Sequence, residues 1–215
     1  MIVGCCGHTS SPMRHPLRIV LASASPRRAE LLAAAGFAFD QRPVEIDERV
    51  RVGESPEDYV SRLASEKSAR ALELIHSRSR SRTVVLGADT AVVIDGAILG
   101  KPANDGEARE MLQWLSGRRH DVLTGVSVRY AGSDAVAVVL TAVFVAPLGD
   151  QEIAWLVQSG EGRDKAGGYA VQGRAARFVQ RIEGSYSNVV GLPVATFYEL
   201  LGRLGLDGHD LAPGD

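Results

Sequence analysis

Residues 17–36, LRIVLASASPRRAELLAAAG, join a short apolar run directly to a set of helix-start signals. The run over 17–23 is typical of a short buried strand. Ser25 then offers an N-cap, Pro26 suits the first helical position, and Gly36 follows the last apolar position of the helix. The stretch therefore predicts a buried strand, a tight turn and a helix.

The same alternation of strand and helix continues on the C-terminal side of this unit. Asp95-Gly96 predicts a hairpin turn after a strongly β segment, and Asn104 with Glu107 predicts a helix N-terminus. Hairpins intermixed with helices favour a mixed sheet over a purely parallel one. The expected elements are helices from Ser55-Pro56, over 104–117, over 150–158 and over 193–204, and strands over 83–94, 121–130, 136–145 and 176–182, with a polar connection over 44–54 and a charged surface loop over 76–82.

Composition excludes several classes of protein. The net charge of −2, from 24 basic and 26 acidic residues, provides no global basic field for nucleic acid. No apolar run approaches the roughly 18–20 residues of a membrane span, and the first residues lack the apolar core of a signal peptide. The two cysteines, Cys5 and Cys6, are adjacent, which favours a reducing cytoplasm; a metal site with His8 is the lesser alternative.

Two arginines break the electrostatic rules of helix termini. Arg27 and Arg28 lie in the first turn of the predicted helix, where the macrodipole is already positive. Free N–H groups, the hydroxyls of Ser23 and Ser25, and two guanidinium groups would converge there on a phosphate. The alternative is that both arginines are solvated and paired with Glu30 or another acid.

Lys67 and Asp89 are charged residues in apolar surroundings. Lys67 shares a helical face with apolar residues, so its side chain either reaches the edge of the core or points into a cleft at an anion. Asp89 lies within the β segment TVVLGADTAVVI (83–94), where an ionised carboxylate needs hydrogen bonds, a cation or a metal. A structural aspartate that accepts from backbone amides is the alternative. Lys101 follows the hairpin and can fold back toward Asp89.

A glycine-rich stretch, GEGRDKAGGYAVQG (160–173), supplies further candidates for ligand binding. Its glycines permit close approach of the backbone, Lys165 adds a positive charge, and Gln172 offers both donor and acceptor groups. The sequence contains no Walker-type loop, no strand-linked GxGxxG, no HExxH, no paired CxxC and no GxSxG.

Eight segments in order resemble the Maf family of nucleotide pyrophosphatases. The resemblance covers about residues 17–205. The segments are ASASPRRAELL (22–32), IDE (46–48), SEK (65–67), GADT (87–90), GKP (100–102), LSGRRHDVLTGV (115–126), DKAGGYAVQG (164–173) and GSYSNVVGLP (184–193).

The resemblance implies an α/β fold in which an elongated mixed sheet is flanked by helices and two lobes surround a central cleft, as in inosine-triphosphatase-like proteins. It places one domain over 17–205, an N-terminal extension over 1–16 and a loose C-terminal tail over 206–215. It also implies a homodimer and hydrolysis between the α and β phosphates with Mg²⁺ or Mn²⁺.

Site residues carry over one position at a time. Asp89 matches the proposed general base that activates water, and Glu48 matches a second catalytic position. Glu48 and Asp89 both match positions near the metal, and Lys67 matches a position that serves both catalysis and the triphosphate. Ser23, Arg28 and Lys101 match the other positions that hold the triphosphate. Arg27, Thr90 and Gln172 match the branch of the family that prefers dTTP and UTP, and Gln172 could recognise the donor and acceptor edge of the pyrimidine.

The implied function is removal of unwanted pyrimidine nucleotides, including modified ones, from the nucleotide pool. Two alternatives remain open at this point. One is the same reaction with another base preference, such as a purine or 7-methyl-GTP. The other is a nucleotide-binding regulator of septum formation or cell division with little catalysis.

Overall fold

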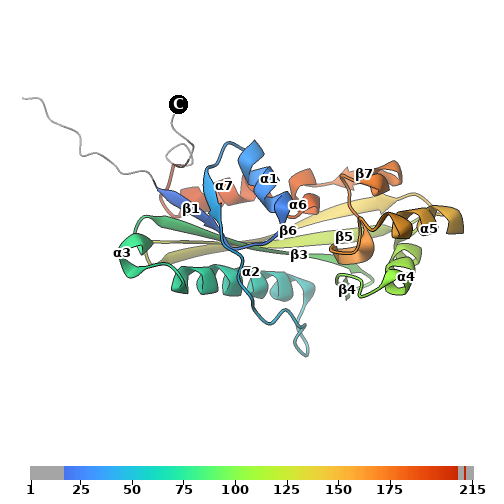
Figure 1. Ribbon diagram of the computed structural model, residues 1–215, viewed down its shortest axis with the longest axis horizontal. Coiled ribbons are helices and arrows are strands. Elements are labelled where there is room, and N and C mark those ends of the chain that lie inside the picture. Colours follow the sequence, from blue (N-terminus) through green and yellow to red (C-terminus); the bar gives the residue numbers. More distant parts are fainter. Residues whose placement is uncertain (1–16, 208–210, 212–215) are drawn as a thin grey trace, which may run out of the picture.

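A seven-stranded mixed sheet runs the length of the molecule (Figure 1). The computed structural model describes residues 17–207 and 211, so the interpretations placed on Cys5, Cys6 and His8 lie outside the described residues. The strand order is β2-β1-β3-β5-β6-β7, with β4 also paired to β3. β1 is parallel to both of its neighbours, and all other pairs are antiparallel. The strands are β1 Arg18–Leu21, β2 Phe39–Gln41, β3 Thr83–Ile94, β4 Ala97–Leu99, β5 Arg119–Tyr130, β6 Ser133–Val145 and β7 Val179–Glu183.

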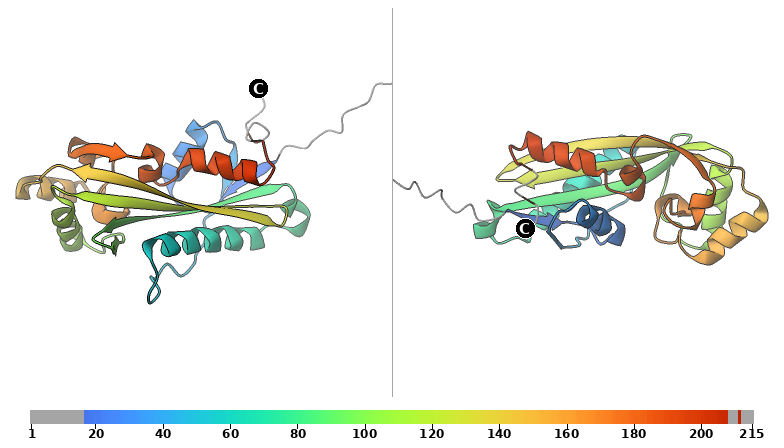
Figure 2. Two further views of the ribbon diagram at one scale, coloured as in Figure 1. Left: turned by 180° about the vertical axis from the view of Figure 1, so that it is seen from behind. Right: turned by 90° about the horizontal axis from the view of Figure 1, so that it is seen from above.

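Helices cover both faces of this sheet. One long helix, α2, lies along one face, while α1, α6 and α7 lie on the other (Figures 1 and 2). α4 and α5 gather at the far end with β4 and β7, so the elongated molecule has two lobes joined by shared strands. The helices are α1 Pro26–Ala34, α2 Pro56–Glu73, α3 Ser77–Arg80, α4 Asp105–Leu115, α5 Asp150–Ser159, α6 Tyr186–Val190 and α7 Val194–Arg203, with 3₁₀ turns at Ala166–Gly168 and Arg174–Arg177. Within residues 17–207 and 211, no helix is both long and apolar enough to cross a membrane.

Alternation along β3 divides the core between the two faces. Val84, Leu86 and Ala88 pack with α1 and α7 in the largest apolar cluster, whereas Val85 faces α2. Beyond this region Val92 contributes to a separate cluster in the far lobe. A strand buried on both faces reads as a nearly continuous apolar run, as TVVLGADTAVVI does. Asp89 is therefore an exception within a buried strand.

Local signals predicted most of the element boundaries. Ser55 Oγ accepts from Asp58 N at 3.1 Å, and Asn104 Oδ1 accepts from Glu107 N at 3.0 Å, so both helices begin at the predicted residues. Asp95 and Gly96 have φ of 51° and 79°, which suits the hairpin between β3 and β4. Ser25 occupies the N-cap position of α1, but its side chain makes no capping hydrogen bond.

Several short elements differ from the sequence-based expectation. Residues 77–80 form the helical turn α3 where a loop was expected, and β7 begins at residue 179 because residues 174–177 coil into a 3₁₀ turn. The strand β2 and the five-residue helix α6 were not predicted. Leu211, within the expected loose tail, is 2% exposed and packs in the core beside α7, so that expectation does not hold at this residue.

Candidate active site

The cleft lies at a notch in the sheet along one edge of β3. β1 pairs with β3 up to Leu86, and β4 pairs with it only from Val92 onward. Between these points no strand in the described part of the chain pairs with this edge of β3. Residues that point to opposite faces of the strand, Asp89 and Thr90, can therefore line one cleft of about 600 Å³.

All ten residues singled out from the sequence line this cleft. They come from the β1–α1 turn, the loop before α2, α2 itself, β3, the segment after β4 and the glycine-rich stretch. The structure thus brings together segments up to about 150 residues apart, although the role of each residue stays a prediction. The ten are Ser23, Arg27, Arg28, Glu48, Lys67, Asp89, Thr90, Lys101, Lys165 and Gln172.

A buried lysine bridges two carboxylates on the α2 side of the cleft. Lys67 Nζ lies 2.6 Å from Asp89 Oδ1 and 2.6 Å from Glu48 Oε1. Lys67 and Asp89 are each 8% exposed, so Lys67 points into the cleft, and the partner of Asp89 is an ammonium group rather than a backbone amide. Burial alone raises the pKa of Glu48, but the hydrogen bond from Lys67 and the charges of Lys67, Lys101 and Arg28 bring it below its ordinary value.

Two glycines let α2 approach the sheet closely enough for this bridge. A Cβ at Gly87 would lie 2.2 Å from the Ala64 carbonyl oxygen, and one at Gly125 would lie 2.2 Å from the Val60 carbonyl oxygen. Gly125 pairs with Asp89 in the β3–β5 register. The helix backbone therefore rests on β3 itself, two residues before Asp89, and on β5 directly opposite Asp89, which fixes the distance that Lys67 has to span.

On the other face of β3, Arg28 is a buried cation held by neutral oxygens. Its guanidinium donates to the Gly191 carbonyl oxygen at 2.8 Å, to Ser23 Oγ at 3.0 Å and to Thr90 Oγ1 at 3.1 Å. Arg28 is 9% exposed, and burial lowers its pKa, although the charge of Asp89 opposes this effect. No acid within residues 17–207 and 211 forms an ion pair with Arg28, and such a desolvated, preorganised guanidinium is suited to an anion.

The glycine-rich stretch crosses the cleft from the far lobe. Arg27 pairs with Asp164 at 3.2 Å, and Lys165 pairs with Asp164 at 2.6 Å. Burial raises the pKa of Asp164, but Lys165 and Arg27 together hold it below its ordinary value. Arg27 therefore pairs with Asp164 and not with Glu30. This contact links the N-terminal turn of α1 to the opposite rim of the cleft.

Lys101 and Gln172 are both exposed at the rim of the cleft. Lys101 lines the same cleft as Asp89, but in the described part of the chain it forms no ion pair with that residue; its charge acts on Glu48 instead. Gln172 lines the cleft, and its carboxamide makes no hydrogen bond with the described residues, so its donor and acceptor groups are available to a ligand.

Sequence reasoning missed two tyrosines that line the cleft. Tyr59 donates from its hydroxyl to the Glu48 carbonyl oxygen at 3.0 Å, and the charges of Asp89 and Glu48 add to burial in raising its pKa to about 12. Tyr169 is hydrogen-bonded through its hydroxyl to His120 Nε2 at 2.7 Å. Nothing in the sequence around Tyr59 indicates a role in the site, apart from its position near the start of a helix. Tyr169 lies inside the segment DKAGGYAVQG (164–173), but the resemblance assigned it no role.

The buried His120 provides a test by pH. Burial, reinforced by the charge of Arg119, lowers the pKa of His120 to about 4, against roughly 6.5 in an unfolded chain. Between these values the unfolded chain binds a proton that the folded chain does not, so stability falls as the pH drops from 6.5 toward 4. Between pH 7.5 and pH 5, we expect the unfolding free energy of His120→Gln to fall by about 2 kcal/mol less than that of the wild type.

Urea unfolding at several pH values measures this effect. His76→Gln is the matched control, because the exposed His76 is in solvent in both states. If the unfolding free energy of His120→Gln fell between pH 7.5 and pH 5 as much as that of the wild type, groups other than His120 would cause the fall.

The chain is similar in sequence to proteins of one family over most of its length. The family described as Maf-like protein matches residues 18–204. The dTTP/UTP pyrophosphatase of Anaeromyxobacter dehalogenans (strain 2CP-C) is 54% identical over 192 residues, which are 87% of this chain and 94% of that protein. Proteins of the same name from Syntrophus aciditrophicus and Neisseria meningitidis serogroup B are 48% and 46% identical over 200 and 189 residues, with 90% and 87% of this chain and 95% and 94% of theirs covered.

The solved structure of the Staphylococcus aureus Ham1 protein matches with a TM-score of 0.42 and 12% identity, over 87% of this chain and 99% of that one. This likeness is too low to support an argument. The family match covers nearly all of the described residues and includes every segment from which the resemblance was drawn. The chain belongs to the Maf family.

Proposed function

We propose that this chain hydrolyses dTTP and UTP to the monophosphate and pyrophosphate, and so removes unwanted pyrimidine nucleotides from the pool. The relatives named above as dTTP/UTP pyrophosphatases support this proposal. The observation that carries it is a carboxylate, Asp89, held by Lys67 in a cleft rich in cations. The cationic side chains that line the cleft are Arg27, Arg28, Lys67, Lys101 and Lys165.

Asp89 is the proposed general base. It would orient a water molecule for attack on the α-phosphorus and accept its proton, while the bond from that phosphorus to the bridging oxygen breaks. Negative charge then builds on the leaving pyrophosphate, where Arg28, Lys101 and Lys165 would stabilise it. The N-terminus of α1, which lines the cleft beside Arg28, adds N–H groups that favour an anion.

The donor set on the α2 side fits a divalent metal. Glu48 and Asp89 converge on one cation position, now taken by the Lys67 ammonium, and Mg²⁺ or Mn²⁺ prefers such oxygen ligands. Within residues 17–207 and 211, no group of three or more His, Cys, Asp or Glu side chains is arranged so that it could hold a metal ion by itself. Glu48 and Asp89 would therefore hold an ion that takes its other ligands from water and phosphate. Such an ion supplies charge neutralisation at the phosphates.

Base preference is assigned to Arg27, Thr90 and Gln172. Thr90 Oγ1 accepts a hydrogen bond from Arg28 at 3.1 Å and is hydrogen-bonded to Thr124 Oγ1 at 3.0 Å. These contacts favour a role for Thr90 in positioning the Arg28 guanidinium. Gln172 is the candidate for contact with the base, because its amide is unpaired by the described residues and lines the cleft. A site that takes both dTTP and UTP tolerates a methyl group at C5, so pyrimidines modified at that atom are included in the proposal.

Gln172→Ala tests the contact with the base. We expect kcat/KM for UTP to fall about tenfold, because a buried base edge would lose its hydrogen-bond partner, while weak activity on GTP changes little. Gln180→Ala, on the exposed face of β7, is the matched control. Equal losses for UTP and GTP would assign Gln172 to a role other than base recognition.

The homodimer, the cytoplasmic location and the absence of a nucleic-acid partner are parts of the same proposal. Nucleoside triphosphates are kept in the cytoplasm, and the net charge of −2 offers no general attraction to nucleic acid. Light scattering of the purified chain measures the oligomeric state directly.

The deciding experiment measures pyrophosphate release from each common nucleoside triphosphate and 7-methyl-GTP, with Mg²⁺ or Mn²⁺. Release chiefly from dTTP and UTP is the expected result. Release chiefly from a purine would keep the reaction and reject the base preference. Tight nucleotide binding by folded protein without release from any of them would reject the reaction and favour a nucleotide-binding regulator.

A further inference from the structure

The segment that carries Glu48 has no regular secondary structure of its own. Residues 42–55 connect β2 to α2 and contain a turn but no helix or strand. The side chain of Glu48 is 49% exposed, so packing against its own surroundings does little to fix it. A carboxylate in such a segment needs outside contacts to keep a defined position.

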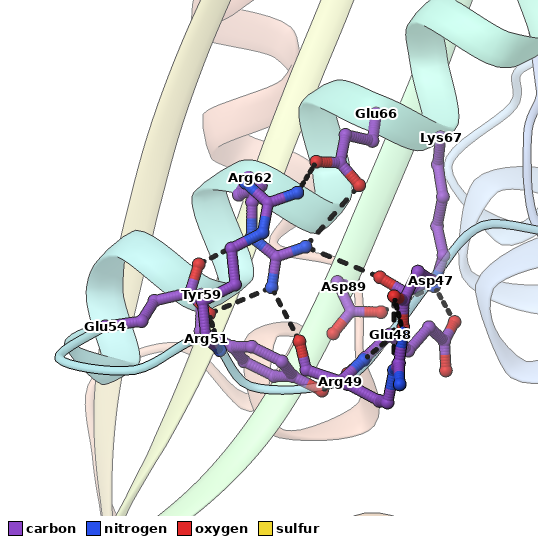
Figure 3. A network of polar contacts seen from close by, with 10 residues as sticks. All are labelled: Asp47, Glu48, Arg49, Arg51, Glu54, Tyr59, Arg62, Glu66, Lys67 and Asp89. Carbon is purple, nitrogen blue, oxygen red and sulfur yellow. Dashed lines mark hydrogen bonds and ion pairs between the residues drawn. The ribbon is translucent and has the colours of Figure 1, made fainter.

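Three consecutive carbonyl groups of this segment are bound by side chains of α2 (Figure 3). Arg62 donates to the carbonyl oxygen of Asp47 at 3.4 Å and to that of Arg49 at 3.1 Å. Tyr59 donates to the carbonyl oxygen of Glu48 itself at 3.0 Å. The peptide groups on both sides of Glu48 are therefore tied to one rigid helix.

Arg62 is itself held firmly. Its Nε and Nη2 atoms lie 2.5 and 2.9 Å from the two carboxylate oxygens of Glu54, and Nη1 lies 3.4 Å from Glu66. The side chains of Arg62 and Glu54 are only 12% and 8% exposed. The hydrogen bond from Arg62, which outweighs the burial of the carboxyl group, lowers the pKa of Glu54 to about 2, so this bidentate pair stays ionised across any practical assay pH.

We propose that Arg62 is a positioning residue for Glu48: it fixes the backbone on both sides of that residue, so that the Glu48 carboxylate meets Lys67 beside Asp89. The same helix thus holds the backbone of the segment through Arg62. It holds the Glu48 carboxylate through Lys67, whose Nζ lies 2.6 Å from Glu48 Oε1. Arg62 is not among the residues that line the cleft, so its effect on the site is indirect, through the segment and through Tyr59, over whose ring its guanidinium lies. This inference rests on the proposed pyrophosphatase activity for its kinetic consequences.

The first test compares Arg62→Met with Arg70→Met. Arg70 lies on the same helix, is exposed and pairs with Glu73, so its loss changes surface charge alone. We expect Arg62→Met to lower kcat for UTP about tenfold and to leave KM within about twofold, because a catalytic carboxylate is misplaced while the phosphate site is intact. Arg70→Met should behave like the wild type. Equal kcat values in both variants would overturn the proposal.

The second test is a double-mutant cycle with Glu48→Gln. If Arg62 works through Glu48, then Arg62→Met adds less than about a twofold loss to the Glu48→Gln protein. If the loss in kcat of the double variant equalled the product of the two single losses, Arg62 would act by another route, and the proposal would be overturned. Circular dichroism checks that the variants fold, and Arg62→Lys serves if Arg62→Met does not. A lysine keeps the charge but cannot bind both carbonyl groups and Glu54 together, so kcat should still fall about threefold.

Hydrogen exchange gives a readout independent of activity. Amides over residues 44–54 should exchange about ten times faster in Arg62→Met than in the wild type or Arg70→Met. Unchanged exchange would overturn the inference even if activity fell. If the wild type releases no pyrophosphate from any nucleotide, the proposed function fails, and this comparison alone then supports or overturns the positioning of Glu48 by Arg62.

Discussion

Asp89→Asn protein should fold normally and release pyrophosphate from UTP about 10³-fold more slowly than the wild type. Asparagine has nearly the same shape but cannot accept the proton of an attacking water, and a general base contributes roughly 10²–10⁴ to rate. The fold should persist because Lys67 keeps its second carboxylate, Glu48, at 2.6 Å and is not left as an unpaired buried charge.

Single-turnover release with enzyme in excess over UTP and with saturating Mg²⁺ measures this loss without interference from product release. Asp95→Asn is the matched control, since Asp95 lies just after the same strand in an exposed pair with Arg118. Turnover in Asp89→Asn within tenfold of the wild type would remove Asp89 from the role of base and leave it as an anchor for Lys67.

Gly87→Ala should lower the free energy of unfolding by about 3 kcal/mol, the upper range for an overpacked core. The added Cβ would lie 2.2 Å from the Ala64 carbonyl oxygen and 2.8 Å from Ser68 N, both of which are backbone atoms of α2. Because these are backbone atoms, only a shift of α2 and β3 relative to each other relieves that contact. Since Lys67 lies on α2, turnover should also fall in the fraction that remains folded.

Urea unfolding followed by circular dichroism measures the change in stability. Gly202→Ala in α7 has nothing within 4 Å of the new Cβ and should stabilise the protein slightly, because alanine favours a helix more than glycine does. If Gly87→Ala unfolded at the same urea concentration as the wild type, α2 would not lie in backbone contact with β3 at Gly87.

The features that could be predicted from the sequence are those that depend on residues close together in the chain or on a charge placed within an apolar pattern. The turn at Asp95-Gly96 and the caps at Ser55 and Asn104 depend on neighbouring residues, so short-range signals were sufficient. Lys67 and Asp89 were found because a charge inside an apolar pattern needs a partner. The Maf resemblance was confirmed by the family match over residues 18–204.

The missed features depend on contacts between distant segments. Nothing near Arg62 indicates that its guanidinium binds carbonyl groups 13 and 15 residues earlier in the chain. Burial of Leu211 requires a core that only the assembled sheet provides. β2 is three residues long, and within the described residues it pairs with β1 alone. A segment this short carries too little periodicity to be recognised from the sequence.

The three long central strands also determine how the cleft can open. β3, β5 and β6 have 12, 12 and 13 residues, roughly 40 Å each, and both lobes are built on them (Figure 2). Within residues 17–207 and 211 the lobes are joined by these shared strands and not by a flexible linker, so widening the cleft must twist a hydrogen-bonded sheet, whose stiffness resists it. Large-amplitude closure of the kind found in hinged enzymes is therefore not expected here.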